Sequence, residues 1–292
     1  MKIRTTISVL FILFIIFQPA HAQLFWKISG NGITKPSYLL GTHHLIEKEK
    51  IPSFVNITAC IPQTDIVVGE MDMSRMMSMQ MKLMKAAFMK DTTMNQLLGD
   101  DDYKLVDTVF RQLLGVGLNK FGRLKPAMLS ALYEVKLYMK EMNLKKEPET
   151  VDIAIQNIGK KNKKQILGLE TIDQQIDILF NSKSLKRQAY LLVETVRNEN
   201  KMPELLKQLN GAYLSGDLET ISRLAEEDES MSDEDMNILI NNRNKNWMEQ
   251  LLKIIPEKSC FIAVGCYHLV DKQGLIQLFR NAGYTVEPVE FN

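Results

Sequence analysis

Apolar residues along the chain follow two alternating patterns, which predict short strands separated by long helical stretches. Short apolar runs bounded by glycine, proline or polar residues are typical of strands. They occur at residues 25–29, 37–41, 65–70, 164–170, 260–265 and 284–289. Between them, apolar residues recur every three or four positions, which places them on one face of a helix. This spacing covers residues 101–118, 125–142, 171–226, 233–255 and 269–283, with two or three helices expected in 171–226. The alternation predicts an α/β fold in which a small mixed central sheet is heavily covered by helices.

The first 22 residues have a different pattern, that of a secretory signal peptide. A short basic start, an apolar run at 7–17 and the sequence Ala20-His21-Ala22 are its three parts. An uncleaved anchor is the alternative, but the run is shorter than the roughly 20 residues of a membrane span. We therefore expect cleavage after Ala22, a single domain at 23–292 without a membrane span, and a periplasmic or secreted protein.

The amino-acid composition and net charge bear on which kind of partner the protein binds. The chain is 45% hydrophobic and 24% charged, with a formal net charge of +1. These values are typical of a globular protein, and they give no reason to expect a nucleic-acid partner. Three cysteines, Cys60, Cys260 and Cys266, form an odd set, and the sequence leaves their pairing open.

Polar side chains that can do chemistry follow four of the predicted strands: His44, Glu70, Glu170 and His268. A glycine stands three residues before each of these histidines, in "GTHH" and "GCYH". A glycine lets the backbone turn at a strand end, and the carboxyl edge of such a sheet is where ligands bind. Imidazole serves there as a metal ligand or a base. The shared form of the two motifs also suggests an internal duplication.

Each of these residues also has a purely structural interpretation. A histidine at a strand end can be a hydrogen-bonded core residue, and Glu170 can be an acidic residue that favours the start of a helix. His43 is either a site residue, as a partner that orients His44 or an auxiliary ligand, or a surface neighbour outside the site. Adjacent residues in an extended segment point to opposite faces, which favours the second reading for His43. Two matching motifs in one chain favour a functional site over two unrelated core histidines.

These motifs and their flanking segments resemble the TraB/GumN family (TraB/PrgY/GumN), which is related to the TIKI metalloproteases that act on Wnt proteins. The resemblance covers essentially the whole mature chain. It is carried by "SYLLGTHHL", "DIVVGEMD", "VDIAIQNIGKKNKKQILGLETIDQQI", "YLSGDLE", "NNRNKNWMEQL" and "FIAVGCYHLVDKQGLIQLFRNAGYTVEPV". The resemblance selects His44 over His43 as the motif histidine. One departure is a threonine, in "ETVD", where the family often has a glycine shortly before the residue that matches Asp152.

The resemblance implies a metal-dependent hydrolase, expected to be a peptidase that acts on a peptide or protein substrate. His44, His268 and Glu70 would hold a divalent ion, with Mn, Co and Zn as the candidates. Glu170 would act as general base and Arg243 would stabilise the oxyanion, with Asn244 as a further polar residue of the site. The alternative is a non-catalytic envelope protein of the same fold that binds a peptide or haem.

A methionine-rich stretch, residues 71–94, holds nine of the 17 methionines. Met73, Met77, Met81 and Met84 have the spacing of one helical face. Methionine fills irregular gaps in a core or lines an adaptable groove, and we expect one of these roles. A copper(I) site and a flexible lid are the alternatives.

Overall fold

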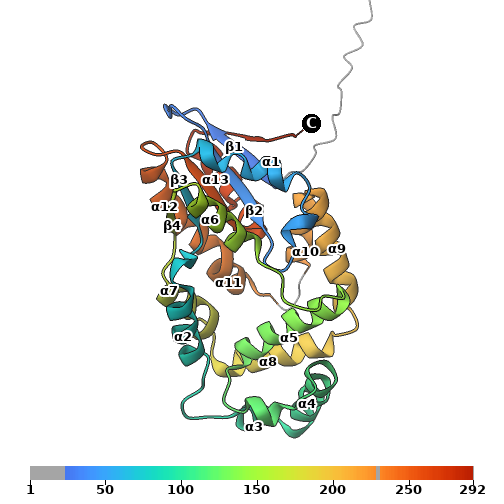
Figure 1. The fold of residues 1–292 in the computed structure, drawn as a ribbon. Coiled ribbons are helices and arrows are strands. Elements are labelled where there is room, and N and C mark those ends of the chain that lie inside the picture. The colour runs from blue at the N-terminus through green and yellow to red at the C-terminus, as the bar shows by residue number, and fades with distance from the viewer. Residues whose placement is uncertain (1–23, 228–230, 292) are drawn as a thin grey trace, which may run out of the picture.

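In the computed structural model, which describes residues 24–227 and 231–291, the predicted strands form one mixed sheet (Figure 1). The strands are β1 (Phe25–Ser29), β2 (Ser37–Thr42), β3 (Ile66–Gly69), β4 (Gln165–Gly168), β5 (Cys260–Gly265) and β6 (Thr285–Pro288). Their order across the sheet is β4-β3-β5-β2-β1-β6. The strands β4, β3, β5 and β2 are parallel, whereas β1 pairs antiparallel with both β2 and β6. The predicted α/β fold with a mixed central sheet is confirmed.

The described α-helices are α1 (Phe54–Thr58), α2 (Met76–Ala86), α3 (Met94–Leu97), α4 (Asp100–Leu114), α5 (Pro126–Glu141), α6 (Val151–Lys161), α7 (Ile172–Ile176), α8 (Leu185–Arg197), α9 (Met202–Ser215), α10 (Leu218–Glu226), α11 (Asp233–Met236), α12 (Asn242–Ile254) and α13 (Leu275–Asn281). Two π-helical segments, Asp177–Asn181 and Asn237–Asn241, follow α7 and α11 directly. Such segments are rare in proteins, and those that do occur are often found at functional sites.

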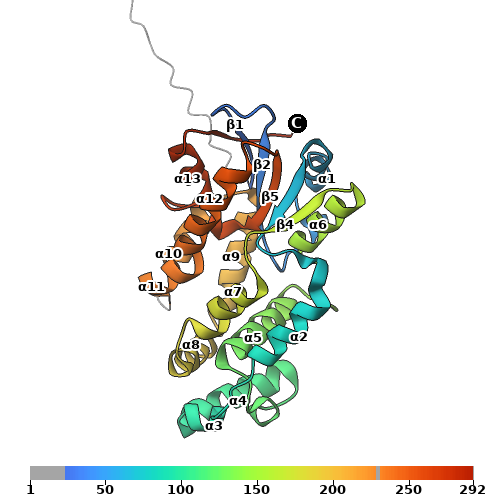
Figure 2. The same cartoon turned by 90° about the vertical axis from the view of Figure 1, so that its left-hand side faces the viewer.

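Helices cover both faces of the sheet, which explains the unbroken apolar character of the central strands. All four residues of β3 and all six of β2 are buried, as expected for strands of a parallel sheet covered on both sides. Figure 2 shows α1 and α6 on one face and α12 and α13 on the other. Helix α6 packs against β3, β4 and β5.

A second apolar cluster lies at the other end of the molecule, where α3, α4, α5 and α8 pack together (Figure 1). Phe110 of α4 and Tyr133 of α5 stack at its centre, with ring centroids 6.1 Å apart. The predicted helix at 101–118 ends early, at Leu114, because Gly115 adopts a positive φ of 74°. A glycine in this conformation is a common helix terminator.

The prediction of one helix over 269–283 is wrong in its first half. Helix α13 begins only at Leu275, and the preceding residues form a tight loop. Asp271 has a φ of 69° and accepts a hydrogen bond from Ser222 of α10. The predicted helix region 171–226 contains α7, a π-helical segment, α8, α9 and α10, more than the two or three helices expected.

The methionine-rich stretch contains α2 and reaches the start of α3, and its described methionines divide between core and surface. Met89 and Met94 are only 3% and 0% exposed. Met81 and Met84 are 71% and 48% exposed. Leu83, Ala86 and Ala87 instead pack against α7 and the π-helical segment that follows it. The expected core role is therefore confirmed for Met89 and Met94, which lie in the second apolar cluster, and is wrong for Met81 and Met84. The side chains of residues 75–78 lie outside the described part. The groove, copper and lid alternatives stay predictions.

Three further expectations concern export and the cysteines. The predicted signal peptide, 1–22, lies outside the described residues. Within the described part of the chain, no helix has the length and apolarity needed to cross a bilayer. Cys60, Cys260 and Cys266 are all buried with free thiols.

A carboxylate at the start of β3 ties this strand to the start of β5. Asp65 Oδ2 accepts hydrogen bonds from the Ser259 amide and hydroxyl groups, both at 2.9 Å. Its Oδ1 accepts one from Lys35 Nζ at 3.0 Å. The Ser259 amide and Lys35 together lower the pKa of Asp65 to about 2. The contact fixes the register of the two strands that lead into the site.

We predict that Asp65→Asn destabilises the fold at neutral pH but not in strong acid. Because the folded-state pKa, about 2, is below the ordinary value of 3.8, the stabilisation is present above pH 3.8 and is lost as the pH falls towards 2. The side chain is 39% exposed, so we expect a loss of only about 1 kcal/mol at pH 7. Urea unfolding of both proteins from pH 7 to pH 2 measures it, with Asp91→Asn as an exposed control. A difference that is constant across this range would contradict the prediction.

Candidate functional site

The two glycine–histidine motifs lie side by side at the carboxyl edge of the parallel strands. Strand β2 pairs directly with β5, with Gly41 opposite Val264 and Thr42 opposite Gly265. A Cβ atom added to Gly41 would lie 3.2 Å from the Cys266 Cα atom. The first motif glycine thus lets the loop of the second motif pass closely, and this contact brings the ends of β2 and β5 together.

The two predicted glutamates are also neighbours, because β3 and β4 continue side by side beyond their last paired residues. The Glu170 amide donates to the Glu70 carbonyl at 2.8 Å. Glu70 Oε1 accepts the Gly265 amide at 2.9 Å and lies 3.9 Å from His268 Nε2. The parallel register therefore places two carboxylates beside the second motif histidine.

Arg243, on α12, joins these residues through its guanidinium group. Its Nε donates to Glu170 at 2.8 Å, and its Nη2 donates to Glu70 at 2.5 Å and to Glu170 at 2.9 Å. Its Nη1 donates to the Leu239 carbonyl and to His268 Nε2, both at 3.1 Å. A guanidinium group has five N–H donors. All five donors of Arg243 are therefore engaged within the protein.

Glu170 is equally well occupied. Its Oε1 accepts the Trp247 indole N–H at 2.9 Å in addition to Arg243 Nε, and its Oε2 accepts Gln175 Nε2 and Arg243 Nη2. The side chain is only 6% exposed. In this arrangement Glu170 anchors Arg243. To act as the predicted general base, Glu170 would have to lose one of these four hydrogen bonds so that its carboxylate could accept a proton.

The His268 ring is fixed by Asn244. The Asn244 amide nitrogen donates to the carbonyls of His268, at 3.2 Å, and of Gln273, at 2.8 Å. Its Oδ1 therefore faces His268 Nδ1, at 2.7 Å, and accepts the ring N–H. His268 Nε2 keeps its lone pair, directed at Arg243. Burial lowers the pKa of His268 to about 3, so the ring is neutral at ordinary pH.

Glu70 stays ionised although it is largely buried. Burial raises its pKa, but its electrostatic interactions with His268, Arg243 and His44 and the hydrogen bond from the Gly265 amide outweigh this effect and lower the pKa to about 2. Because His44 contributes to the lowered pKa of Glu70, the first motif histidine lies close enough to Glu70 for their charges to interact.

His44 differs from His268 in being accessible, with 64% of its side chain exposed. Its Nδ1 lies 3.0 Å from Asp152 Oδ2, and Thr42 donates to Asp152 Oδ1 at 2.8 Å. The hydrogen bond with Asp152 raises the pKa of His44 to about 9. Asp152 is a site residue that was recognised from the sequence only as a position matching the family, without an assigned role. Its place in the first turn of α6, after the N-cap Thr150, was the available signal.

His43 points away from this cluster. Its ring packs against Tyr213 and Tyr138, with centroid distances of 5.3 and 6.1 Å. Its Nδ1 accepts the Leu45 amide at 3.1 Å, and burial lowers its pKa to about 4. The adjacent histidines thus divide as the extended geometry predicts, with His44 at the site and His43 in an aromatic environment.

As the side chains lie, the predicted metal ligands do not form a complete set. Among the described residues, no group of three or more His, Cys, Asp and Glu side chains is arranged to hold a metal ion. Glu70 and His268 lie close together, but His268 Nε2 faces Arg243 Nη1, and His44 Nδ1 faces Asp152. A divalent ion at these three residues stays a prediction that the present arrangement does not fit.

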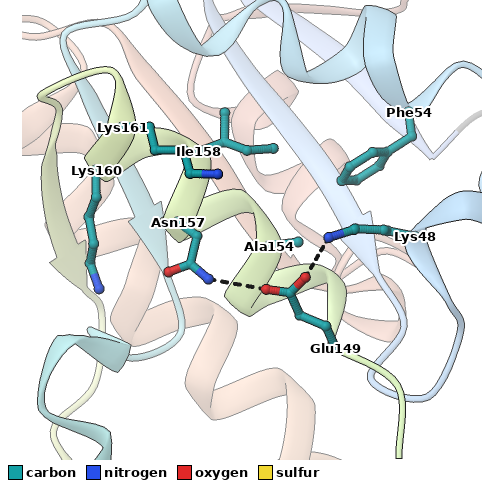
Figure 3. Close-up of a pocket in the computed structure, with 8 residues that line it drawn as sticks. All are labelled: Lys48, Phe54, Glu149, Ala154, Asn157, Ile158, Lys160 and Lys161. Atoms are coloured by element: carbon teal, nitrogen blue, oxygen red, sulfur yellow. Dashed lines mark hydrogen bonds and ion pairs between the residues drawn. The ribbon is translucent and has the colours of Figure 1, made fainter.

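A second ion pair joins the same two segments as His44 and Asp152. Lys48 donates to Glu149 Oε2 at 2.5 Å, and Asn157 donates to Oε1 of the same carboxylate at 3.1 Å (Figure 3). The pair borders a groove of about 380 Å³ between α1 and α6, across which Phe54 and Ile158 face one another. The loop after β2 is thus held to the start of α6 at two points, which limits how far His44 can move.

We predict that Asn244→Ala destabilises the protein and releases the His268 ring. The change leaves a buried imidazole N–H and two carbonyls without their partner, for which we expect a loss of about 2 to 3 kcal/mol. Denaturant unfolding measures the loss, and ¹⁵N NMR of the imidazole shows whether the hydrogen stays on Nδ1. Asn281→Ala, at the exposed end of α13, is the control, with an expected change below about 0.5 kcal/mol. Equal stability of the two variants would refute the prediction.

Comparisons with known proteins identify the family. Searches of curated proteins and of solved structures found no match. The model of the TraB/PrgY/gumN family matches residues 24–288, which include every described strand and helix. The match contains both glycine–histidine motifs, the two glutamates and the arginine that joins them. The chain therefore belongs to the TraB/PrgY/gumN family.

Proposed function

We propose that the chain is a secreted or periplasmic hydrolase that cleaves peptide bonds in a peptide or protein substrate. The observation that carries the proposal is the exposed His44 imidazole, held by Asp152 beside a buried ionised cluster. The cluster lies at the carboxyl edge of parallel strands, where α/β sheets bind their ligands. The expected relation to the TIKI metalloproteases is part of the same proposal.

His44 acts on the substrate in this proposal. Hydrolysis of an amide requires that the leaving nitrogen receives a proton, and a positioned imidazolium can donate it. Asp152 orients the ring through Nδ1, so that Nε2 carries the proton that is transferred. Asp152 in turn is held by Thr42, at the end of β2, so the proton donor is fixed to the sheet.

Glu70 is the carboxylate better placed to bind the attacking water. It accepts hydrogen bonds from the Gly265 amide and from Arg243 and is 16% exposed. Glu170 accepts four hydrogen bonds and is less exposed, so a water molecule would have to displace one of its donors. Arg243 and Asn244 position Glu70 and His268. The predicted divalent ion would require Arg243 to leave His268, so no step here is assigned to it.

A peptide-binding protein without turnover is the second candidate. The observation that favours it is the closed hydrogen-bond network, in which Arg243 has no N–H left to stabilise an oxyanion. A binder needs only the surface around His44. A hydrolase needs some of the buried hydrogen bonds of Arg243 and Glu170 to break when the substrate binds.

We predict that residues 23–292, which contain every described element, cleave peptides and that His44→Ala and Asp152→Asn remove most of this activity. Loss of a positioned proton donor lowers kcat/KM by roughly 100-fold or more. Cleavage is measured by mass spectrometry on a mixed peptide library, with EDTA and with added Mn²⁺, Co²⁺ or Zn²⁺.

The matched control is His43→Asn, whose side-chain oxygen can still accept the Leu45 amide and which keeps most of the activity. Cleavage that survives in His44→Ala would contradict the role of His44. Peptides that are bound but never cleaved, under all metal conditions, would favour the binding protein.

A further inference from the structure

The guanidinium of Arg243 lies where the metal-binding atoms of two predicted ligands converge. His268 Nε2 keeps its lone pair and accepts from Arg243 Nη1 at 3.1 Å. Glu70 Oε1 lies 3.9 Å from the same imidazole nitrogen, and Glu70 Oε2 accepts from Arg243 Nη2 at 2.5 Å. We propose that Arg243 is the resident cation of this cluster and that a divalent ion binds Glu70 and His268 only by displacing its guanidinium.

The charges of the cluster support this exchange. Glu70 and Glu170 carry two negative charges in largely buried positions, and Arg243 supplies one positive charge. His268 adds none, because its ring donates at Nδ1 and accepts at Nε2, as a neutral imidazole does. A single guanidinium therefore leaves the cluster with a net charge of −1, whereas a divalent ion in its place would neutralise both carboxylates. Buried charges are stable only when they are paired, so one cation or the other is required.

The contacts that hold the Arg243 guanidinium determine the free-energy cost of its displacement by an ion. Glu170 holds the guanidinium through Nε and Nη2, and the Leu239 carbonyl holds Nη1. The guanidinium carbon also lies 4.8 Å from the centre of the Trp247 ring, within the range of a cation–π contact. An incoming ion has to break these contacts as well as shed its own water. The wild-type protein should therefore bind a divalent ion more weakly than a variant without the arginine.

The inference concerns cation binding and is independent of peptide cleavage. Mn²⁺ alone is the probe, because carboxylate and imidazole ligands suit it and its free form gives an EPR signal. We expect Arg243→Gln, in residues 23–292, to bind one Mn²⁺ at least tenfold more tightly than the wild type. Arg243→Lys keeps the positive charge, and its Mn²⁺ affinity should stay close to that of the wild type.

Two further measurements keep the test decisive. The double variant Arg243→Gln/His268→Ala should lose the gain, which locates the ion at the cluster. If Arg243→Gln is unstable on its own, Mn²⁺ should raise its melting temperature more than that of the wild type, since an ion that binds only the folded state stabilises it.

Three results would overturn the proposal. One is equal Mn²⁺ affinity in wild type and Arg243→Gln, and another is no measurable binding in either. The third is a gain in affinity that persists after His268→Ala, because the ion would then be held elsewhere. A protein that cleaves peptides but shows any of these results would keep the proposed function and lose this inference.

Discussion

The arrangement of the site depends on the five hydrogen bonds that Arg243 donates. Through them one guanidinium joins the ends of β3 and β4, the loop after β5, and the π-helical segment that precedes α12. Two carboxylates on neighbouring strands would repel one another in a largely buried setting. The arginine turns this repulsion into an attraction that holds the elements together, and it also uses up the hydrogen-bonding capacity of the site.

The site therefore has two parts with different properties. The inner part, around Arg243, is buried, ionised and fully hydrogen-bonded, which makes it rigid. The outer part consists of His44 and Asp152, and its imidazole is accessible to solvent. A rigid inner part can fix the geometry of the strand ends, whereas the outer part is open to solvent. Asn244 and Thr42 have similar roles in the two parts. Asn244 fixes the ring of His268, and Thr42 fixes Asp152, the hydrogen-bond partner of His44.

Much of this arrangement could be predicted from the sequence, because strand ends and buried polar residues leave local signals. The apolar runs located every strand, and the polar residues after β2, β3, β4 and β5 all lie at one edge of the sheet. The role of Asp152 could not be predicted in the same way. It depends on the start of α6 meeting the end of β2, where Thr42 contacts Asp152 from 110 residues away in the chain. The exposed methionines of α2 and the late start of α13 were also missed, since neighbouring helices decide both.

The position of β5 in the sheet has a consequence for how the protein is made. Strand β5 lies between β3 and β2, which do not pair with each other, yet it comes after residue 259 of a 292-residue chain. A polypeptide that emerges from its N-terminus cannot join β2 to β3 until the residues up to Gly265 are available. During that interval β2 and β3 present unpaired edges, the kind of surface that chaperones protect from aggregation. A chain that is truncated before β5 lacks the second motif histidine, His268, as well as the strand that joins β2 to β3.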